Sequence, residues 1–237
     1  MKIPVFVMAA LCLLLNVSGC AMMDISTLDT AIPVAPADLQ VAPYQAIGLD
    51  LSSAVYNEND ADDKDKYAGV DMASGIKANI SIKPDLDLQV RAYTGLESSQ
   101  GFKIGVKKLI RQETNNYVAF APAIVYVRQT SEHDKDKSRA YGVEMQLLYT
   151  QKWGKTSATV TMRGNYERMV YSEYSNGEYA GIDNKEYDLM HGGLRVNLCW
   201  KGKHLYFIPE LGIELVPVIN GKLSMIPAMG YAIGVEF

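Results

Sequence analysis

The feature that most constrains this chain is a strict alternation of apolar and polar residues that recurs along most of its length. In the stretch YGVEMQLLY, for example, Tyr141, Val143 and Tyr149 share one face while Glu144 and Gln146 share the other. Because successive side chains of a β-strand point to opposite faces, each such window predicts a strand with one apolar and one polar face. From residue 44 onward no stretch has a convincing helical period. The windows are residues 45–56, 67–82, 86–95, 101–111, 117–129, 140–150, 157–168, 187–200, 204–215 and 226–237.

The connections between these ten windows alternate in length. Those after odd-numbered windows are long or charged, such as NENDADDKDK, whereas those after even-numbered windows are short, such as KPD and KGK. An even number of strands with long loops at one end and tight turns at the other predicts an all-β fold, an antiparallel up-and-down transmembrane β-barrel with both termini on the turn side. Eight or twelve strands remain open, because the window 45–56 is the least regular and residues 169–187 have room for another hairpin.

Alternation alone leaves open whether the apolar faces point outward to lipid or inward to a dry core. The polar faces carry many charges, which suit the lumen of a membrane barrel, where they can pair with one another or meet trapped water. Aromatic residues also end several apolar faces, as interfacial girdles require. They are Tyr141, Tyr149, Tyr166, Trp200 and Phe237. The alternative is a soluble, lipid-anchored, lipocalin-like barrel that binds an apolar ligand inside.

The N-terminus has the pattern of an export signal. Residues 1–19 begin with the cation Lys2, continue through an apolar stretch too short to span a bilayer and end in small residues, which predicts a signal peptide. The sequence VSGC at residues 17–20 resembles the lipobox of bacterial lipoproteins. This resemblance implies cleavage before Cys20, a lipid on Cys20 and, because no aspartate follows it directly, export to the outer membrane. An ordinary secretory signal with a chance cysteine is the alternative.

Residues 20–43 carry three prolines and no sustained period, so we interpret them as a lipidated tether that precedes a barrel domain at residues 44–237. With Cys20 acylated and Cys12 lost with the signal, Cys199 is the single remaining thiol, and no disulfide can form within the mature chain. The net charge of −4 argues against a nucleic-acid partner.

The C-terminal sequence GYAIGVEF resembles the last strand of bacterial outer-membrane barrels, although no specific subfamily is matched. The resemblance rests on the terminal aromatic Phe237 and the alternate apolar residues Tyr231, Ile233 and Val235. In that family the last strand closes the barrel against the first and is read by the insertion machinery. The resemblance implies a periplasmic N-terminus, periplasmic short turns and extracellular long loops. Expected partners are outer-membrane lipids, the barrel-insertion and lipoprotein-sorting machineries, and an unidentified extracellular ligand of loops 57–66, 130–139 and 169–186.

The turn sequence KGKH allows a prediction inside the lumen. Gly202 and Lys203 suit the central pair of a type II′ hairpin, a register in which Trp200 faces Leu205. In the same register Arg195 faces Glu210 as a lumen ion pair, and His191 faces Glu214. A ten-stranded barrel is scarcely wider than the eight-stranded kind that side chains fill, so we predict a packed polar lumen without an open pore.

These features favour a non-enzymatic outer-membrane lipoprotein with a structural or surface-interaction role. An outer-membrane barrel enzyme acting on lipid or peptide is a further alternative, for which His191 is the candidate catalytic residue and Glu214 its orienting partner. No serine falls beside His191 on the lumen face, so a nucleophile is missing. The aspartate-rich NDADDKDK lacks the glycine and distal glutamate of a calcium loop, and we expect neither a metal nor a cofactor.

Overall fold

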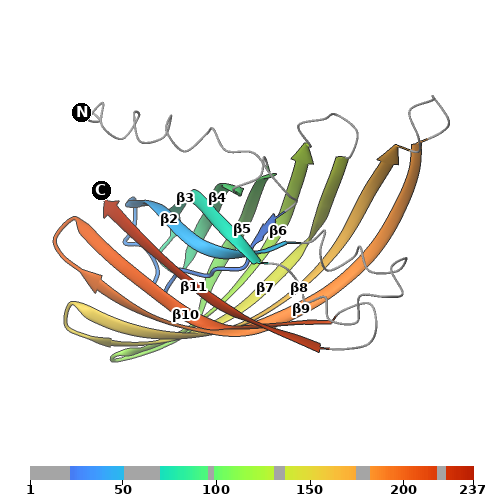
Figure 1. Ribbon diagram of the computed structural model, residues 1–237. Helices are drawn as coiled ribbons and strands as arrows, with labels where there is room; N and C mark the ends of the chain where they lie inside the picture. The colour runs from blue at the N-terminus through green and yellow to red at the C-terminus, as the bar shows by residue number, and fades with distance from the viewer. Residues whose placement is uncertain (1–21, 51–69, 96–98, 131–136, 175–181, 218–222) are drawn as a thin grey trace.

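Ten long antiparallel strands, β2 to β11, form a closed barrel, and a short strand, β1, lies inside it (Figure 1). The structure is a computed structural model that describes residues 22–50, 70–95, 99–130, 137–174, 182–217 and 223–237. The strands are β1 (Met22–Asp24), β2 (Leu39–Asp50), β3 (Val70–Lys83), β4 (Leu86–Gly95), β5 (Ser99–Glu113), β6 (Asn116–Thr130), β7 (Lys137–Trp153), β8 (Thr156–Tyr174), β9 (Ile182–Lys201), β10 (Leu205–Pro217) and β11 (Leu223–Glu236). Within these ranges no helix is both long and apolar enough to cross a membrane.

The first and last long strands close the barrel. β2 pairs with β3 along one edge and with β11 along the other, and the remaining strands pair in sequence order. At the seam the Phe237 amide donates to the Leu39 carbonyl at 3.0 Å, and the Leu39 amide donates back at 3.2 Å. The predicted contact of the last strand with the first is therefore confirmed.

All ten predicted strands are present, and the first differs most in its bounds. β2 begins at Leu39, so residues 39–43 belong to the barrel and not to the predicted tether. Pro43 hides this strand in the sequence, because proline lacks an amide hydrogen and is rare inside sheets. The β2–β11 ladder indeed skips residues 42 and 43. The twelve-stranded alternative is wrong, because residues 169–174 belong to β8 and residues 182–187 to β9.

The two ends of the barrel differ in their connections. At the end where β2 begins and β11 ends, which we call the short-turn end, Gly154 and its successor suffice to join β7 to β8. Gly154 has φ = 60°, a left-handed conformation that tight hairpin turns need. At the opposite, long-connection end the linking residues lie outside the described ranges, and so do all of the predicted binding loop 57–66 and parts of the loops 130–139 and 169–186. These linking residues are 51–69, 96–98, 131–136, 175–181 and 218–222.

The apolar faces point outward and the charged faces point inward. On β7, Tyr141, Met145 and Tyr149 are exposed on the outer surface, whereas Glu144 and Gln146 are buried in the lumen. The other strands repeat this pattern, so the outer surface carries the apolar band of a transmembrane barrel. The lipocalin-like alternative, which needs an apolar lumen and a polar exterior, is therefore wrong.

The predicted register of the β9–β10 hairpin is wrong by two residues. The Gly202 amide donates to the Leu205 carbonyl at 2.7 Å, so the residues between them form the turn. Trp200 consequently lies opposite Phe207 instead of Leu205, and the two rings stack with centroids 5.8 Å apart. A shift of two residues leaves every side chain on its predicted face, because the strand period is two.

Candidate functional site: a lumen closed by the N-terminal segment

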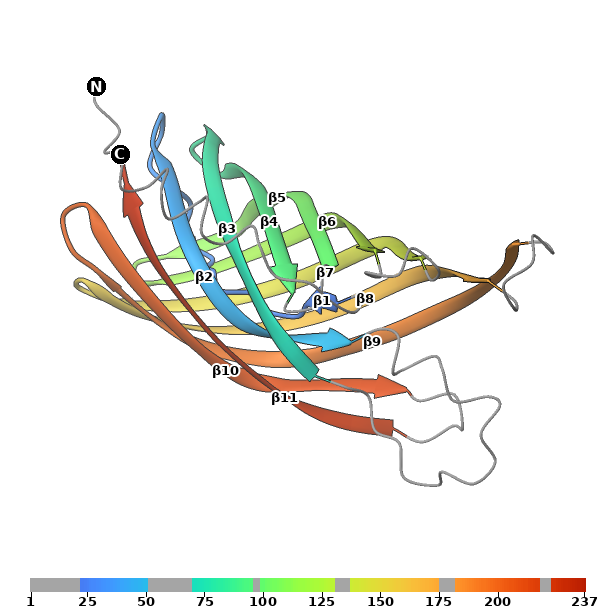
Figure 2. The same cartoon turned by 45° about the horizontal axis from the view of Figure 1, so that its top comes forward.

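Residues 23–34, which we call the plug segment, run through the barrel lumen ahead of β2 (Figure 2). The segment starts in β1, where Met23 pairs with Leu49 in the long-connection half of β2. It then descends toward the short-turn end, where a turn closed by Asp38 and Ala35 at 2.9 Å leads into β2. Met23, Ile25, Leu28 and the residues between them are buried. The predicted tether is thus largely an internal part of the barrel.

The lumen wall holds the plug segment by its backbone. Each of the six basic side chains buried in the wall donates a hydrogen bond to a carbonyl of the segment. The wall donors and their acceptors are Lys77 to Leu28, Arg91 to Ser26 and Thr27, Lys103 to Asp24, Lys107 to Thr30 and Ile32, Arg163 to Ile25, and Arg195 to Ile25. Charged donors make stronger hydrogen bonds than neutral ones, so this arrangement fixes an irregular backbone that has almost no sheet partners of its own.

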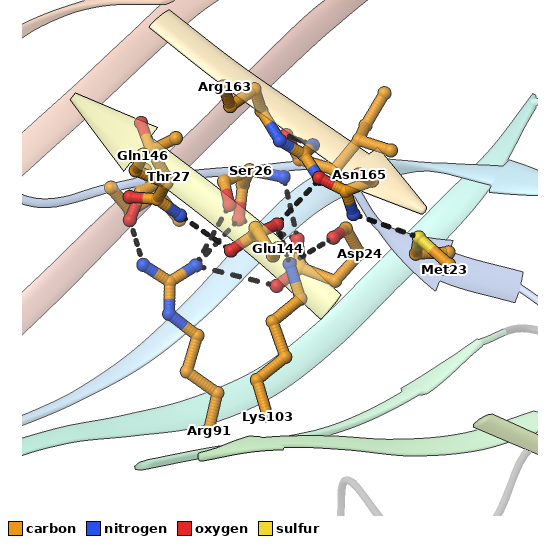
Figure 3. A network of polar contacts seen from close by, with 12 residues as sticks. Met23, Asp24, Ser26, Thr27, Arg91, Lys103, Glu144, Gln146, Arg163 and Asn165 are labelled. Carbon is orange, nitrogen blue, oxygen red and sulfur yellow. Dashed lines mark hydrogen bonds and ion pairs between the residues drawn. The ribbon is translucent and has the colours of Figure 1, made fainter. Parts of the chain in front are cut away.

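Two aspartates of the plug segment extend these contacts to ion pairs. Asp24 lies 3.5 Å from the Arg91 guanidinium and accepts from the Tyr44 hydroxyl at 2.8 Å. Asp29 lies 3.3 Å from the Lys107 ammonium. Figure 3 shows how Asp24, Lys103 and neighbouring side chains converge on one network inside the barrel. The segment therefore supplies counter-charges as well as backbone acceptors.

Glu210, on β10, also binds the plug segment. Its carboxylate accepts from the Thr27 amide at 2.8 Å, the Leu28 amide at 2.6 Å and the Thr27 hydroxyl. Leu28 has φ = 43°, in the left-handed region, and its amide and that of Thr27 both point to this one carboxylate. This backbone conformation costs a non-glycine residue about 1–2 kcal/mol of conformational free energy, which the contacts with Glu210 and the surrounding wall offset.

Apolar contacts complete the closure. Met23, Ile25 and Leu28 join a buried cluster with Tyr44 and other wall residues, and Ala31 joins a second cluster around Leu148 nearer the short-turn end. A cavity of about 220 Å³ remains below them, lined by Asp29, Ile32 and residues of the short turns. The plug segment thus occupies the middle of the lumen with a small vestibule at the short-turn end.

His191 lies in a carboxylate cluster on the wall that is connected to the plug segment through Arg195. Its Nδ1 is 2.5 Å from Glu214 and its Nε2 is 2.8 Å from Glu167. Both ring nitrogens can donate only when the imidazole is protonated. Across the described lumen, six buried basic side chains face seven buried carboxylates, two of them from the plug segment, and a protonated His191 makes these charges equal.

The predicted lumen residues meet in a different combination. Arg195 forms its ion pair with Glu214 and lies opposite Gly212, so the predicted pairing with Glu210 is wrong, for the same two-residue shift of register. His191 and Glu214 do meet, diagonally, but the second nitrogen of His191 is occupied by Glu167, and the cluster presents no nucleophile. Cys20 and the signal peptide lie outside the described residues.

Sequence reasoning missed the plug segment. A signal was present in residues 22–34, MMDISTLDTAIPV, because this stretch combines apolar residues with only two charges. That composition is unlike a solvated tether, which is usually rich in charge and poor in hydrophobic residues. Nothing in the strand pattern, however, places such a segment inside the barrel, because its contacts are to carbonyls that every residue possesses.

Comparison with known proteins identifies the fold. No family model matches the chain, and no curated protein does either. Among solved structures, the chain is similar to the outer membrane protease OmpT from Escherichia coli, with a TM-score of 0.50 at 8% identity over 89% of this chain and 99% of that one. The translocator domain of autotransporter NalP from Neisseria meningitidis is also similar, with a TM-score of 0.46 at 10% identity over 86% of this chain and 88% of that one. The chain has the fold of bacterial outer-membrane β-barrels.

Proposed function

We propose that this protein is an integral outer-membrane barrel that is closed by its own N-terminal segment and has a structural or surface-interaction role. Its short turns and Phe237 face the periplasm, and its long connections face outside the cell. The outer-membrane location is supported by the apolar outer surface together with the fold.

The observation that carries this proposal is the occupation of the lumen by residues 23–34. An open channel keeps its lumen wall available to water, whereas here all six basic wall side chains are engaged by the plug segment. The two interior catalytic candidates, His191 and Glu214, are hydrogen-bonded to each other, and His191 also to Glu167. We therefore assign partner binding to the long connections. Their ligand is unidentified.

Lipidation at Cys20 belongs to the same proposal. The protein would pass through the lipoprotein-sorting and barrel-insertion machineries, and the acyl chains would supplement an anchor that the barrel already provides. A Cys20→Ser variant with an intact cleavable signal tests membrane integration without the lipid. We expect it to stay in the outer-membrane pellet after a carbonate wash and to shift mobility on heating. A soluble periplasmic product would refute an integral barrel.

Planar-bilayer conductance tests the closed lumen. The wild-type protein should give no stepwise current. The double variant Asp24→Arg/Asp29→Arg should give steps, because two new cations facing Arg91 and Lys107 repel the plug segment from the wall. Asp38→Arg, at the turn after the segment, is the matched control and should stay closed. Equal conductance of the wild type and the double variant would refute closure by residues 23–34.

A further inference from the structure

The outer surface has a groove near the long-connection end, across strands β3 to β6. Its volume is about 510 Å³, within the range of roughly 300–1,000 Å³ that small-molecule sites occupy. The groove exists because the small side chain of Ala92 lies between the larger Ile76 and Phe102 of the neighbouring strands. Tyr126 continues this row, with its ring centroid 6.1 Å from that of Phe102. The walls are therefore apolar and face the membrane.

One row nearer the long-connection end, the lining turns polar. Thr94, Gln100 and Arg128 follow one another across β4, β5 and β6, and Arg139 stands directly opposite Arg128 on β7. Both arginines are exposed, and neither forms an ion pair with a residue that the structure describes. Like charges placed directly opposite on neighbouring strands destabilise a sheet. An anion between the two guanidinium groups would remove that repulsion.

The depth of this pair in the membrane indicates what kind of anion it meets. Phe102, Tyr126 and Tyr141 form a row of aromatic side chains across β5, β6 and β7, and such rows mark the interface of a bilayer. Arg128 and Arg139 lie two residues further along their strands, about 7 Å beyond the aromatic row. In the proposed membrane orientation this corresponds to the level of lipid headgroups, and the groove beside Ala92 to the level of the first acyl carbons.

We propose that the groove and the arginine pair form a binding site for a membrane lipid with a phosphorylated headgroup. An acyl chain lies between Ile76 and Phe102 over Ala92, and the phosphate accepts hydrogen bonds from Arg128 and Arg139. Guanidinium groups bind phosphate oxygens in a bidentate manner, and two of them suit a headgroup better than one. This assignment rests on the proposed membrane orientation, because it places the arginines at the leaflet that the long connections face.

Arg168 offers a contrast within the same surface. It is also exposed on the outer face, in the row of Tyr141, but its guanidinium already binds Asp188 at 2.9 Å and Glu186 at 3.7 Å. The chain thus neutralises the outward arginine of β8. The outward arginines of β6 and β7 have no ion-pair partner among the described residues. The difference singles out the end of the groove as the site of anion binding.

Native mass spectrometry of the barrel in detergent micelles tests the site. The probes are phosphatidylglycerol, whose headgroup is anionic, and phosphatidylcholine, whose headgroup is zwitterionic. We expect wild-type protein to retain phosphatidylglycerol at roughly tenfold lower concentration, which corresponds to ~1.4 kcal/mol. Arg128→Gln/Arg139→Gln should abolish this preference. Ala92→Trp, which fills the groove and leaves the charges, should weaken retention of both lipids.

The matched control is Arg111→Gln/Arg168→Gln, which removes the same charge from exposed arginines that already have carboxylate partners. It should keep the wild-type preference. Equal retention of the two lipids by wild-type protein, or an equal loss in the control, would overturn the proposal. Displacement of phosphatidylglycerol by millimolar inorganic phosphate would also overturn it, because the site would then bind free phosphate and not a lipid. If the protein stays in the membrane and conducts no current but fails these lipid tests, the lipid site is contradicted and the proposed function still holds.

Discussion

The arginines of the inner face are paired within the chain, whereas two arginines of the outer face are not. On the inner face, Arg163 binds Glu144 at 2.6 Å and Arg195 binds Glu214, and both also reach the carbonyl of Ile25. On the outer face, Arg128 and Arg139 stand opposite each other without a carboxylate from the described chain. The chain therefore pairs the charged side chains of its lumen by itself, in part through the plug segment. On part of its outer surface, we propose, a membrane lipid supplies the partner of two arginines.

The largest predicted effect distinguishes Glu214, which pairs with Arg195, from Glu210, which binds the plug segment. Glu214→Ala removes the partner of Arg195 and one partner of His191, and breaking a buried pair in this way costs about 3–5 kcal/mol. Glu210→Ala removes hydrogen bonds to the neutral Thr27 and Leu28 amides and should cost less, about 1.5–3 kcal/mol. Urea unfolding of the folded barrel in lipid vesicles measures both.

A double-mutant cycle makes this prediction sharper. Arg195→Met should couple strongly to Glu214→Ala and weakly to Glu210→Ala, because contact partners share an interaction energy and separated residues do not. A stronger coupling to Glu210 would favour the pairing that the hairpin sequence predicts over the one that the structure has.

The next effect concerns the hydrogen bonds and the ion pair between the lumen wall and Asp29 of the plug segment. Asp29→Ala leaves the Lys107 ammonium and the side-chain amides of Asn79 and Gln89 without this acceptor, and a buried group left unsatisfied costs about 1–3 kcal/mol. Thr30→Ala, one residue along and half-buried, is the control and should change stability by less. Proteolysis from the short-turn side offers a second measurement, since a loosened segment is cleaved faster.

An effect of similar size tests how tightly the inner and outer faces are packed. A Cβ added at Gly101 would lie 2.2 Å from the ring of Tyr93 inside the lumen, so Gly101→Ala should destabilise the barrel by about 1–3 kcal/mol. Val143→Ile on the outer face adds the same methylene against lipid and should stay within about 0.5 kcal/mol. Restored stability in Gly101→Ala/Tyr93→Leu would trace the cost to the ring, and equal costs on the two faces would contradict the difference in packing.

The smallest effect probes the corrected register on the outer face. Trp200 and Phe207 stack with an interplanar angle of 13°, and such pairs contribute about 0.5–1.5 kcal/mol beyond burial. The coupling energy of Trp200→Leu and Phe207→Leu should fall in that range, while Trp200→Leu and Leu205→Ala should be additive. The reverse result would restore the register in which Trp200 faces Leu205.

The sequence predicts the barrel well because each strand carries its own signal. Alternation assigns Glu144 to the lumen and Met145 to the membrane independently of what any other strand does, and a register error of two residues leaves these assignments intact. Pairing between strands depends on the details of turns, so the partner of Arg195 was predicted wrongly. The plug segment could not be predicted from alternation at all, because it is held by irregular backbone contacts to side chains from strands far along the chain.

The course of the plug segment also connects the interior of the barrel to its seam. Residues 23–34 receive contacts from β3 to β5 on one side and from β8 to β10 on the other, and β2, which follows them directly, pairs with both β3 and β11. Closing β2 onto β11 therefore completes the wall around the plug segment. The seam and the interior are thus coupled, because the residues that pack inside the barrel continue directly into the strand that closes it.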